Sequence, residues 1–284
     1  MNGAQQASLP TTARGASGWR GASMRLLRMF PGWRLWRFYP ALLFCVLAVL
    51  GWECMARVLH SALVPDVGTI AGEISRILTS GEAFTQIGIT LWRIVLGFAA
   101  AFIVSVLIGI ACARRPAVRI FFEPAIVLGL TVPGLVWTLL CVIWFGVSLA
   151  TPVVAIALGI APTLILTVIQ GVNSVDPDIM EMARAYRLRR VDVFRRIWWP
   201  SLIPFLFSGA RIGFSLAWKV IVLVEIFGLS DGVGYKLNSE FSLQNVEGVM
   251  AWTIVFWLAM SVLEYGVFQN AERALSQWRR EART

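Results

Sequence analysis

Three charged side chains lie within one long, mostly apolar stretch of the sequence. Residues 201–227 contain Arg211, Lys219 and Glu225. At the centre of a membrane-spanning helix, each such charge costs about 2.5–3.5 kcal/mol unless it is paired or hydrated. These groups could therefore form ion pairs, relay protons, or draw an anion into a pathway. An ion pair between Lys219 and Glu225, or between helices, is the simplest interpretation, and a pathway for an anion is the second.

The sequence lacks the common motifs for catalysis, metal binding and nucleotide binding. His60 is the only histidine, and the four cysteines lie in or beside apolar stretches without a C-x-x-C pair. No H-E-x-x-H, G-x-S-x-G or G-x-x-x-x-G-K-S/T motif is present, and Gly232-x-Gly234 falls in an expected external loop. We therefore expect no catalytic, cofactor-binding or metal-binding residues, and no enzyme activity, in this chain.

The composition is that of an integral membrane protein. Hydrophobic residues make up 58% of the 284 residues, charged residues make up 14%, and the mean hydropathy is +0.73. Soluble domains have roughly 45–50% apolar and about 25% charged residues. The net charge of +9 comes without a basic stripe interleaved with aromatic residues, so it indicates membrane topology and not nucleic-acid binding.

Charge distribution and apolar stretches together predict an all-α polytopic protein with six transmembrane helices and both termini in the cytoplasm. Most of the 25 Lys and Arg residues lie in the tails or in two of the loops between apolar stretches, as the positive-inside rule requires. We assign a basic cytoplasmic tail to residues 1–38, the first transmembrane helix to 39–59, a periplasmic segment with a short amphipathic helix to 60–90, a core of five transmembrane helices to 91–270, and a basic cytoplasmic tail to 271–284. A signal-peptide core at 40–52 is the alternative for the first helix, although the long basic tail before it is atypical.

The longest uncharged stretch, residues 124–175, is too long for one helix. Residues 146–152 form the obvious break, so we expect two spans joined by a tight external turn. In the segment PGLVWTLLCVIWFG, which begins at Pro133, that proline is the only one, and any kink must come from it. A kink frees a backbone carbonyl and could widen a pathway. The expected pathway residues are Pro133, Trp137, Trp144, Arg211, Lys219 and Glu225.

Residues 176–200 form a long charged segment between apolar stretches. Asp176–Pro177 is a helix start, because the carboxylate can accept from free amides and proline lacks an amide that would be unused there. Apolar residues follow at helical spacing, namely Ile179, Met182, Ala183 and Tyr186. A second amphipathic piece carries Val191, Phe194, Ile197 and Trp198, before Pro200. We therefore expect two short helices between two long ones.

This segment resembles the EAA loop of the permease subunits of ABC importers. The matching positions are Glu181, Ala183, Pro200, Pro204 and Gly209. Other stretches resemble permeases for nitrate, sulfonates and taurine, namely Trp144-Phe145-Gly146, Leu91-x-Arg93-x-x-x-Gly97, and Arg211 with Trp218 and Glu225, continued by Gly232-x-Gly234-Tyr235. The resemblance covers roughly residues 65–280.

The resemblance implies a type I ABC importer permease architecture in the bacterial inner membrane. Two copies, expected as a homodimer, would form the pathway for a small anionic solute that a periplasmic binding protein delivers. Two separate cytoplasmic ATPase subunits would bind ATP and Mg and dock on residues 177–199. Membrane lipid would surround the protein, and no nucleic acid is implied. The implied ATPase-coupling residues are Glu181, Met182, Ala183, Ala185, Tyr186, Arg187 and Leu188.

Arg187 departs from the family pattern, which usually has glycine six residues after the glutamate. Glycine at that place adopts the left-handed backbone conformation of a helix cap without strain, because it has no Cβ atom. Arg187 therefore implies either a differently closed turn or about 1 kcal/mol of local strain.

A proton-coupled secondary transporter is the alternative function. Arg211, Lys219 and Glu225, together with Glu264, would then form the proton relay. Broken helices in matching inverted halves favour such a transporter, and the sequence shows no such repeat.

Overall fold

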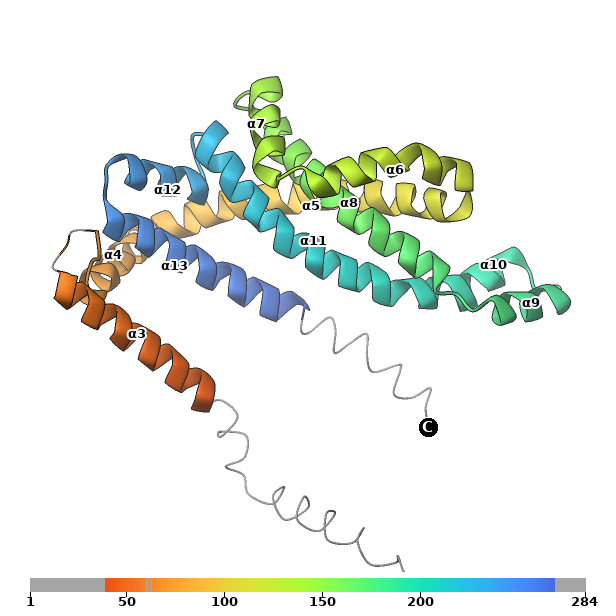
Figure 1. Cartoon of the computed structure of the whole chain (residues 1–284), viewed down its shortest axis with the longest axis horizontal. Coiled ribbons are helices and arrows are strands. Elements are labelled where there is room, and N and C mark those ends of the chain that lie inside the picture. Colours follow the sequence, from red (N-terminus) through yellow and green to blue (C-terminus); the bar gives the residue numbers. More distant parts are fainter. Residues whose placement is uncertain (1–38, 60, 62, 269–284) are drawn as a thin grey trace, which may run out of the picture. The chain divides into compact units, whose positions relative to one another are not determined.

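The computed structural model of the chain describes residues 39–59, 61 and 63–268, and this part is all-helical (Figure 1). The tails expected at 1–38 and 271–284 lie outside the described residues. The chain divides into two units, Met1–Val67 and Gly68–Thr284.

The first unit contains α3 (Tyr39–Leu59), a helix of 21 residues. At about 1.5 Å per residue, this length matches a hydrocarbon core of about 30 Å. Its two charged side chains are paired as their spacing predicts, with Arg57 2.7 Å from Glu53. The second carboxylate oxygen of Glu53 accepts the Val67 amide at 3.0 Å. The one acidic group in this apolar helix therefore has two partners.

Four of the described helices are long and apolar enough to cross a membrane. They are α3, α5 (Glu82–Arg114), α8 (Ala150–Asn173) and α13 (Val246–Leu263), the last extended by a π-helical turn, η3 (Glu264–Phe268). Two bent helix pairs raise the number of crossings to six when each pair counts as one span. These pairs are α6 (Pro116–Thr131) with α7 (Gly134–Phe145), and α11 (Trp199–Gly228) with α12 (Val233–Ser242). The all-helical membrane fold that the sequence predicts is therefore observed, with four to six crossings.

Helix α8 is the central helix of the second unit, where it packs against α5, α6, α7 and α11. Glycines allow α5 and α8 to approach closely. A Cβ atom at Gly97 would lie 2.7 Å from the Ile156 side chain, and one at Gly109 would lie 2.7 Å from Val168. These α5 glycines therefore serve helix packing, a common use of small residues in membrane proteins.

The stretch from residue 116 to residue 145 forms two helices that meet at 103°. The break falls at Val132 and Pro133, and Pro133 has an extended ψ of 140°. Pro133 is thus the place of the bend, as the sequence predicts. Gly146 ends α7 with a φ of 59°, and α8 begins after a short turn. The expected break after residue 146 is confirmed.

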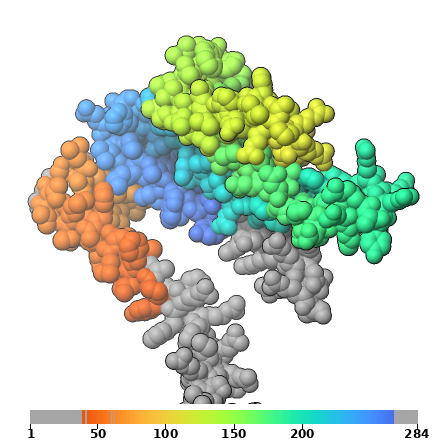
Figure 2. All heavy atoms as spheres, turned by 45° about the vertical axis from the view of Figure 1, so that its right-hand side comes forward, coloured from red at the N-terminus to blue at the C-terminus, as the bar shows by residue number. Residues whose placement is uncertain are grey.

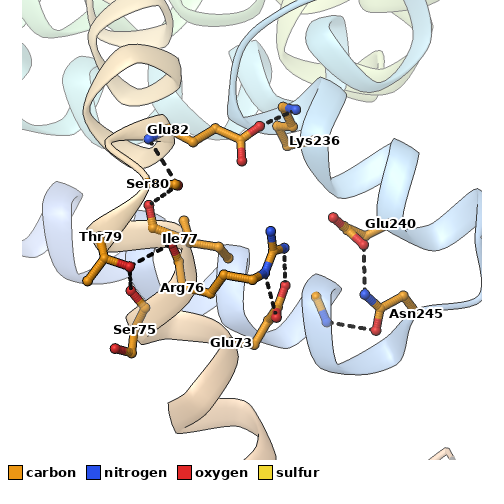
Figure 3. A network of polar contacts seen from close by, with 11 residues as sticks. Glu73, Ser75, Arg76, Ile77, Thr79, Ser80, Glu82, Lys236, Glu240 and Asn245 are labelled. Atoms are coloured by element: carbon orange, nitrogen blue, oxygen red, sulfur yellow. Dashed lines mark hydrogen bonds and ion pairs between the residues drawn. The ribbon is translucent and has the colours of Figure 1, made fainter.

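Polar side chains tie the corner between α4 (Val67–Thr79) and α5 to α12 (Figure 3). Arg76 is paired with Glu73 within α4. Lys236 of α12 is paired with Glu82 at the start of α5. The second contact links two segments that are far apart in the sequence, so it fixes the short helix α12 against the start of a long one.

Candidate functional site

The segment between α8 and α11 begins with a capped helix, α9 (Pro177–Ala185). The Asp176 carboxylate accepts the Asp178 amide at 2.9 Å, and Pro177 takes the first helical position. Both features suit the free amides of a helix start, so the predicted start is confirmed. In Figure 2 the segment projects at one edge of the second unit.

The prediction of a separate second short helix is wrong. Helix α10 (Arg190–Val193) continues through a π-helical turn, η2 (Phe194–Trp198), directly into α11. The Trp199 amide donates to the Phe194 carbonyl, and Pro200 lies just inside α11. Proline has no amide to donate, and a wider turn before it allows the helix to continue without that hydrogen bond. The segment after Arg189 is therefore continuous with the long helix.

The turn between α9 and α10 is closed at Arg187, whose φ is 48°. The Leu188 amide donates to the Ala183 carbonyl, and the Arg187 amide donates to the Arg184 carbonyl, each at 3.0 Å. This pair of bonds is the Schellman closure of a helix end, in which glycine is usual at the left-handed position. Of the two expected outcomes, the glycine-type turn is the one adopted. Arg187 therefore holds backbone strain of about 1–2 kcal/mol.

Large apolar side chains are exposed along this segment, although it lies outside the apolar spans. Tyr186 is 76% exposed and Met182 is 50% exposed, whereas Ala183 is buried. The other exposed large apolar residues are Ile179, Leu188, Val191 and Phe194. Glu181 and Ala185 are exposed as well. We call this exposed set the α9–α10 surface. Apolar surface of this kind outside a membrane is typical of a protein contact site.

A buried charged cluster joins α5 to the end of α11. Glu225 has no exposed surface. Its carboxylate accepts from the Arg93 guanidinium at 3.0 Å, the Thr90 hydroxyl at 3.0 Å and the Gly234 amide at 2.9 Å. Arg93 is also paired with Asp231. Within the described residues no three His, Cys, Asp or Glu side chains group as a metal site. The buried carboxylate is therefore stabilised by a guanidinium and by hydrogen bonds.

Of the two ion pairs that the sequence suggests, the one between helices is confirmed and the one between Lys219 and Glu225 is wrong, because Arg93 of α5 is the partner of Glu225. Residues six apart do not share a helix face, unlike residues three or four apart. Lys219 is instead exposed, with its ammonium 5.6 Å from the centre of the Trp218 ring. Arg211 is also exposed. The structure thus separates the three charges of α11 into two exposed cations and one enclosed anion.

Gly232 and Gly234 surround the Glu225 carboxylate. Gly232 has a φ of 99°, which favours glycine. A Cβ atom at Gly234 would lie 2.5 Å from the Val222 carbonyl and 2.7 Å from the Glu225 Cβ. The Gly-x-Gly pattern is therefore explained by close backbone approach to a buried acid. Asp231 has no local sequence signal, because its partner lies 138 residues away.

The remaining pathway candidates lie on α7. Pro133 is exposed at the bend, and Trp144 is 59% exposed. Trp137 and Trp144 are seven residues apart, a spacing that places them on one helix face. The indole N–H of Trp137 is buried without an acceptor among the described residues, as is that of Trp218 on α11. Since α7 and α11 pack together, two adjacent helices each contribute an indole donor that lacks a partner within the described chain.

Comparison with known sequences gives a consistent set of relatives. The family described as "Binding-protein-dependent transport system inner membrane component" matches residues 105–276. The putative aliphatic sulfonates transport permease SsuC of Bacillus subtilis (strain 168) is 27% identical over 248 residues, which cover 87% of this chain and 88% of the relative. The taurine transport system permease TauC of Escherichia coli (strain K12) is 29% identical, over 68% of this chain and 70% of its own. The nitrate import permease NrtB of Synechococcus elongatus is also 29% identical, over 58% of this chain and 59% of its own.

Two solved structures share the fold. The MetNI methionine ABC transporter, in an inward-facing conformation, gives a TM-score of 0.57 at 16% identity, over 66% of this chain and 93% of the other. An amino acid ABC transporter with histidines gives a TM-score of 0.59 at 17% identity, over 70% of this chain and 97% of the other. At these identities the likeness concerns the helical fold alone.

Proposed function

The chain belongs to the family of binding-protein-dependent transport system inner membrane components, and we propose that it forms the pathway of an ATP-driven importer for a small anionic solute. It is an ABC importer permease of the sulfonate, taurine and nitrate class, and it is integral to the inner membrane. Such permeases are not enzymes, because the ATPase is a separate subunit. ATP and Mg would bind to that subunit and not to this chain.

The observation that carries the proposal is the α9–α10 surface. We propose that an ATPase subunit docks there, with Tyr186 and Met182 entering an apolar cleft of the partner. Glu181 and Ala185 lie beside them on α9 and would complete the contact. Glu181 forms no ion pair with another described residue, so its carboxylate is available to a donor from the partner.

The continuous helix from α10 to α11 suggests how closure of the ATPase would reach the membrane. A displacement of α10 would move α11 with it, because no loop separates the two helices. The other end of α11 is fixed to α5 through Glu225 and Arg93. The ATPase must make different contacts in the two conformations for this coupling to exist.

The pathway itself would be lined by α7 and α11. Pro133, Trp137 and Trp144 lie on the first helix and Arg211 and Lys219 on the second. Exposed cations favour an anionic solute, and an indole N–H is a suitable donor to sulfonate or nitrate oxygens. Glu225 is enclosed, so we assign it to anchoring α11 and not to solute contact. A second identical copy would complete the pathway, since symmetric dimers are the commonest oligomers.

The corner of α4, α5 and α12 is our candidate for the face that meets the solute-binding protein. Its side chains are charged and polar, including the pairs Glu73–Arg76 and Glu82–Lys236 (Figure 3). The predicted topology places these segments outside the cytoplasm, on the side from which solute would arrive. Polar rims of this kind suit contacts that form and separate repeatedly.

The proposed function is tested by co-purification of the chain with its ATPase subunit and by the ATPase activity of the complex. We expect Glu181→Ala to lower both, and Glu247→Ala, an exposed acid at the start of α13, to leave both unchanged. Uptake by this chain alone, driven by a proton gradient without any ATPase, would show instead that it is a secondary transporter.

A further inference from the structure

A pocket of about 710 Å³ lies between the end of α5 and the segment formed by α9, α10 and η2. Four arginines contribute to its lining, namely Arg114, Arg184, Arg187 and Arg190. The rest of the lining is apolar and includes Phe194 and Trp198. The pocket therefore combines several positive charges with an apolar wall, and no acidic residue of the described chain lines it.

The described residues do not neutralise the positive charge of the pocket. No carboxylate of a described residue lies within 4.0 Å of any of the four guanidinium groups. Arg114 lies 5.2 Å over the Trp198 ring, and the Nε of Arg184 donates to the Met180 carbonyl at 3.3 Å. These contacts position two of the guanidinium groups, whose other N–H donors have no carboxylate partner among the described residues. Guanidinium groups gathered in this way favour an oxyanion, above all a phosphate.

The pocket and the proposed ATPase contact use different faces of α9, although Leu188 and Phe194 belong both to the α9–α10 surface and to the pocket lining. Met180, Ala183 and Arg184 line the pocket, and their spacing of three and four residues places them on one face. Met182 and Ala185 lie on the opposite face. An occupant of the pocket would therefore leave Met182 and Ala185 accessible to a docked subunit, and would share only Leu188 and Phe194 with it.

The position of the pocket along the chain favours a lipid over a free anion. Arg114 is the last residue of α5, a helix that can cross the membrane, and Trp198 directly precedes α11. Trp and Arg at the ends of spanning helices lie at the level of lipid headgroups. Basic pockets between helices at that level bind acidic headgroups, while the apolar wall suits the glycerol and upper acyl carbons.

We propose that this pocket binds the phosphate of an anionic phospholipid, which bridges the end of α5 to α9 and α10. The bound lipid then fixes the segment that carries the α9–α10 surface against the end of a spanning helix. This binding site goes beyond the proposed transport function and does not depend on it, because the chain would hold the lipid with or without an ATPase partner.

The test is native mass spectrometry of the intact chain in detergent with equal amounts of phosphatidylglycerol and phosphatidylcholine. We expect the wild type to retain phosphatidylglycerol preferentially, and Arg184→Gln/Arg190→Gln to lower that preference on the order of tenfold. The matched control is Arg189→Gln/Arg195→Gln, which removes the same charge from the same segment outside the pocket lining. It should keep the wild-type preference. If the first double variant does not fold, Arg114→Gln removes one pocket charge from a different helix and should lower the preference severalfold.

Three outcomes would overturn the proposal. If both double variants lost the preference for phosphatidylglycerol equally, that preference would depend only on the overall charge of the segment and not on the pocket. Displacement of phosphatidylglycerol by millimolar inorganic phosphate would identify a free anion as the occupant. Release of the lipid when the ATPase subunit is added would show that the pocket belongs to the ATPase contact and does not hold a lipid in the assembled transporter.

Discussion

The guanidinium of Arg93 donates to the carboxylate of Glu225 at 3.0 Å, across 132 residues of sequence. Their side chains are 9% and 0% exposed. Arg93 and Glu225 belong to two separate sequence motifs. The structure shows that these motifs meet in one contact between α5 and α11. The contact holds the end of the helix whose other end continues into the proposed ATPase-docking segment. It is therefore a fixed point for any movement of α11.

Removing one partner of this buried pair should destabilise the protein strongly. We expect Arg93→Met to lower the free energy of unfolding by about 3–5 kcal/mol, because it leaves the Glu225 carboxylate buried without a counter-charge. Thermal unfolding in detergent measures the effect, with the exposed Lys219→Met as the control that should change little. The double variant Arg93→Met/Glu225→Leu should regain much of the loss. A double variant no more stable than Arg93→Met would contradict this account of the pair.

The glycines that follow Glu225 allow a second test of the same cluster. Gly234→Ala places a methyl group 2.5 Å from the Val222 carbonyl, and we expect a loss of about 1–3 kcal/mol in unfolding free energy from the resulting overpacking. Gly72→Ala on α4 is the matched control, since nothing lies within 4 Å of its added Cβ. It should stabilise the helix by about 0.5–1 kcal/mol. In thermal unfolding we expect Gly234→Ala to lower the stability and Gly72→Ala to raise it. A Gly234→Ala variant as stable as the wild type would disprove the tight contact.

Local features of this chain could be predicted from sequence, and long-range contacts could not. The start of α9 at Asp176–Pro177 and the bend at Pro133 depend on proline and on side chains next to it, so residue types alone indicate them. The partner of Glu225 depends on how α5 packs beside α11, which spacing along α11 does not contain. The sequence does not indicate that α10 continues into α11, because proline normally lies at the start or end of a helix and the π-helical turn before Pro200 has no sequence signal of its own.

The ion pair on α4 predicts a dependence of stability on pH. The hydrogen bond from Arg76 lowers the pKa of the Glu73 carboxyl below its ordinary value of 4.5, although partial burial opposes this effect. The pair therefore contributes stability above pH 4.5 and loses it as the pH falls through the lowered pKa. We expect Glu73→Gln to be less stable than the wild type at neutral pH, by at most about 1 kcal/mol, because the Arg76 side chain is 57% exposed and solvent screens the pair. Unfolding midpoints between about pH 3 and pH 7 should converge in acid, and in an Arg76→Gln background the same substitution should have no such effect.

The strained turn after α9 gives a prediction in the opposite direction, toward higher stability. Arg187 has a φ of 48°, and glycine reaches that region without the contact between Cβ and backbone that other residues make there. We expect Arg187→Gly to stabilise the turn by about 1 kcal/mol, seen as slower hydrogen exchange of the Leu188 amide, which donates to the Ala183 carbonyl. Arg189→Gly is the control, because Arg189 has an extended backbone with a φ of −64°, where glycine only adds freedom to the unfolded chain. Faster exchange in Arg187→Gly than in the wild type would show that the arginine side chain stabilises the turn by more than its backbone strain costs, as a bound lipid phosphate in the adjoining pocket would allow.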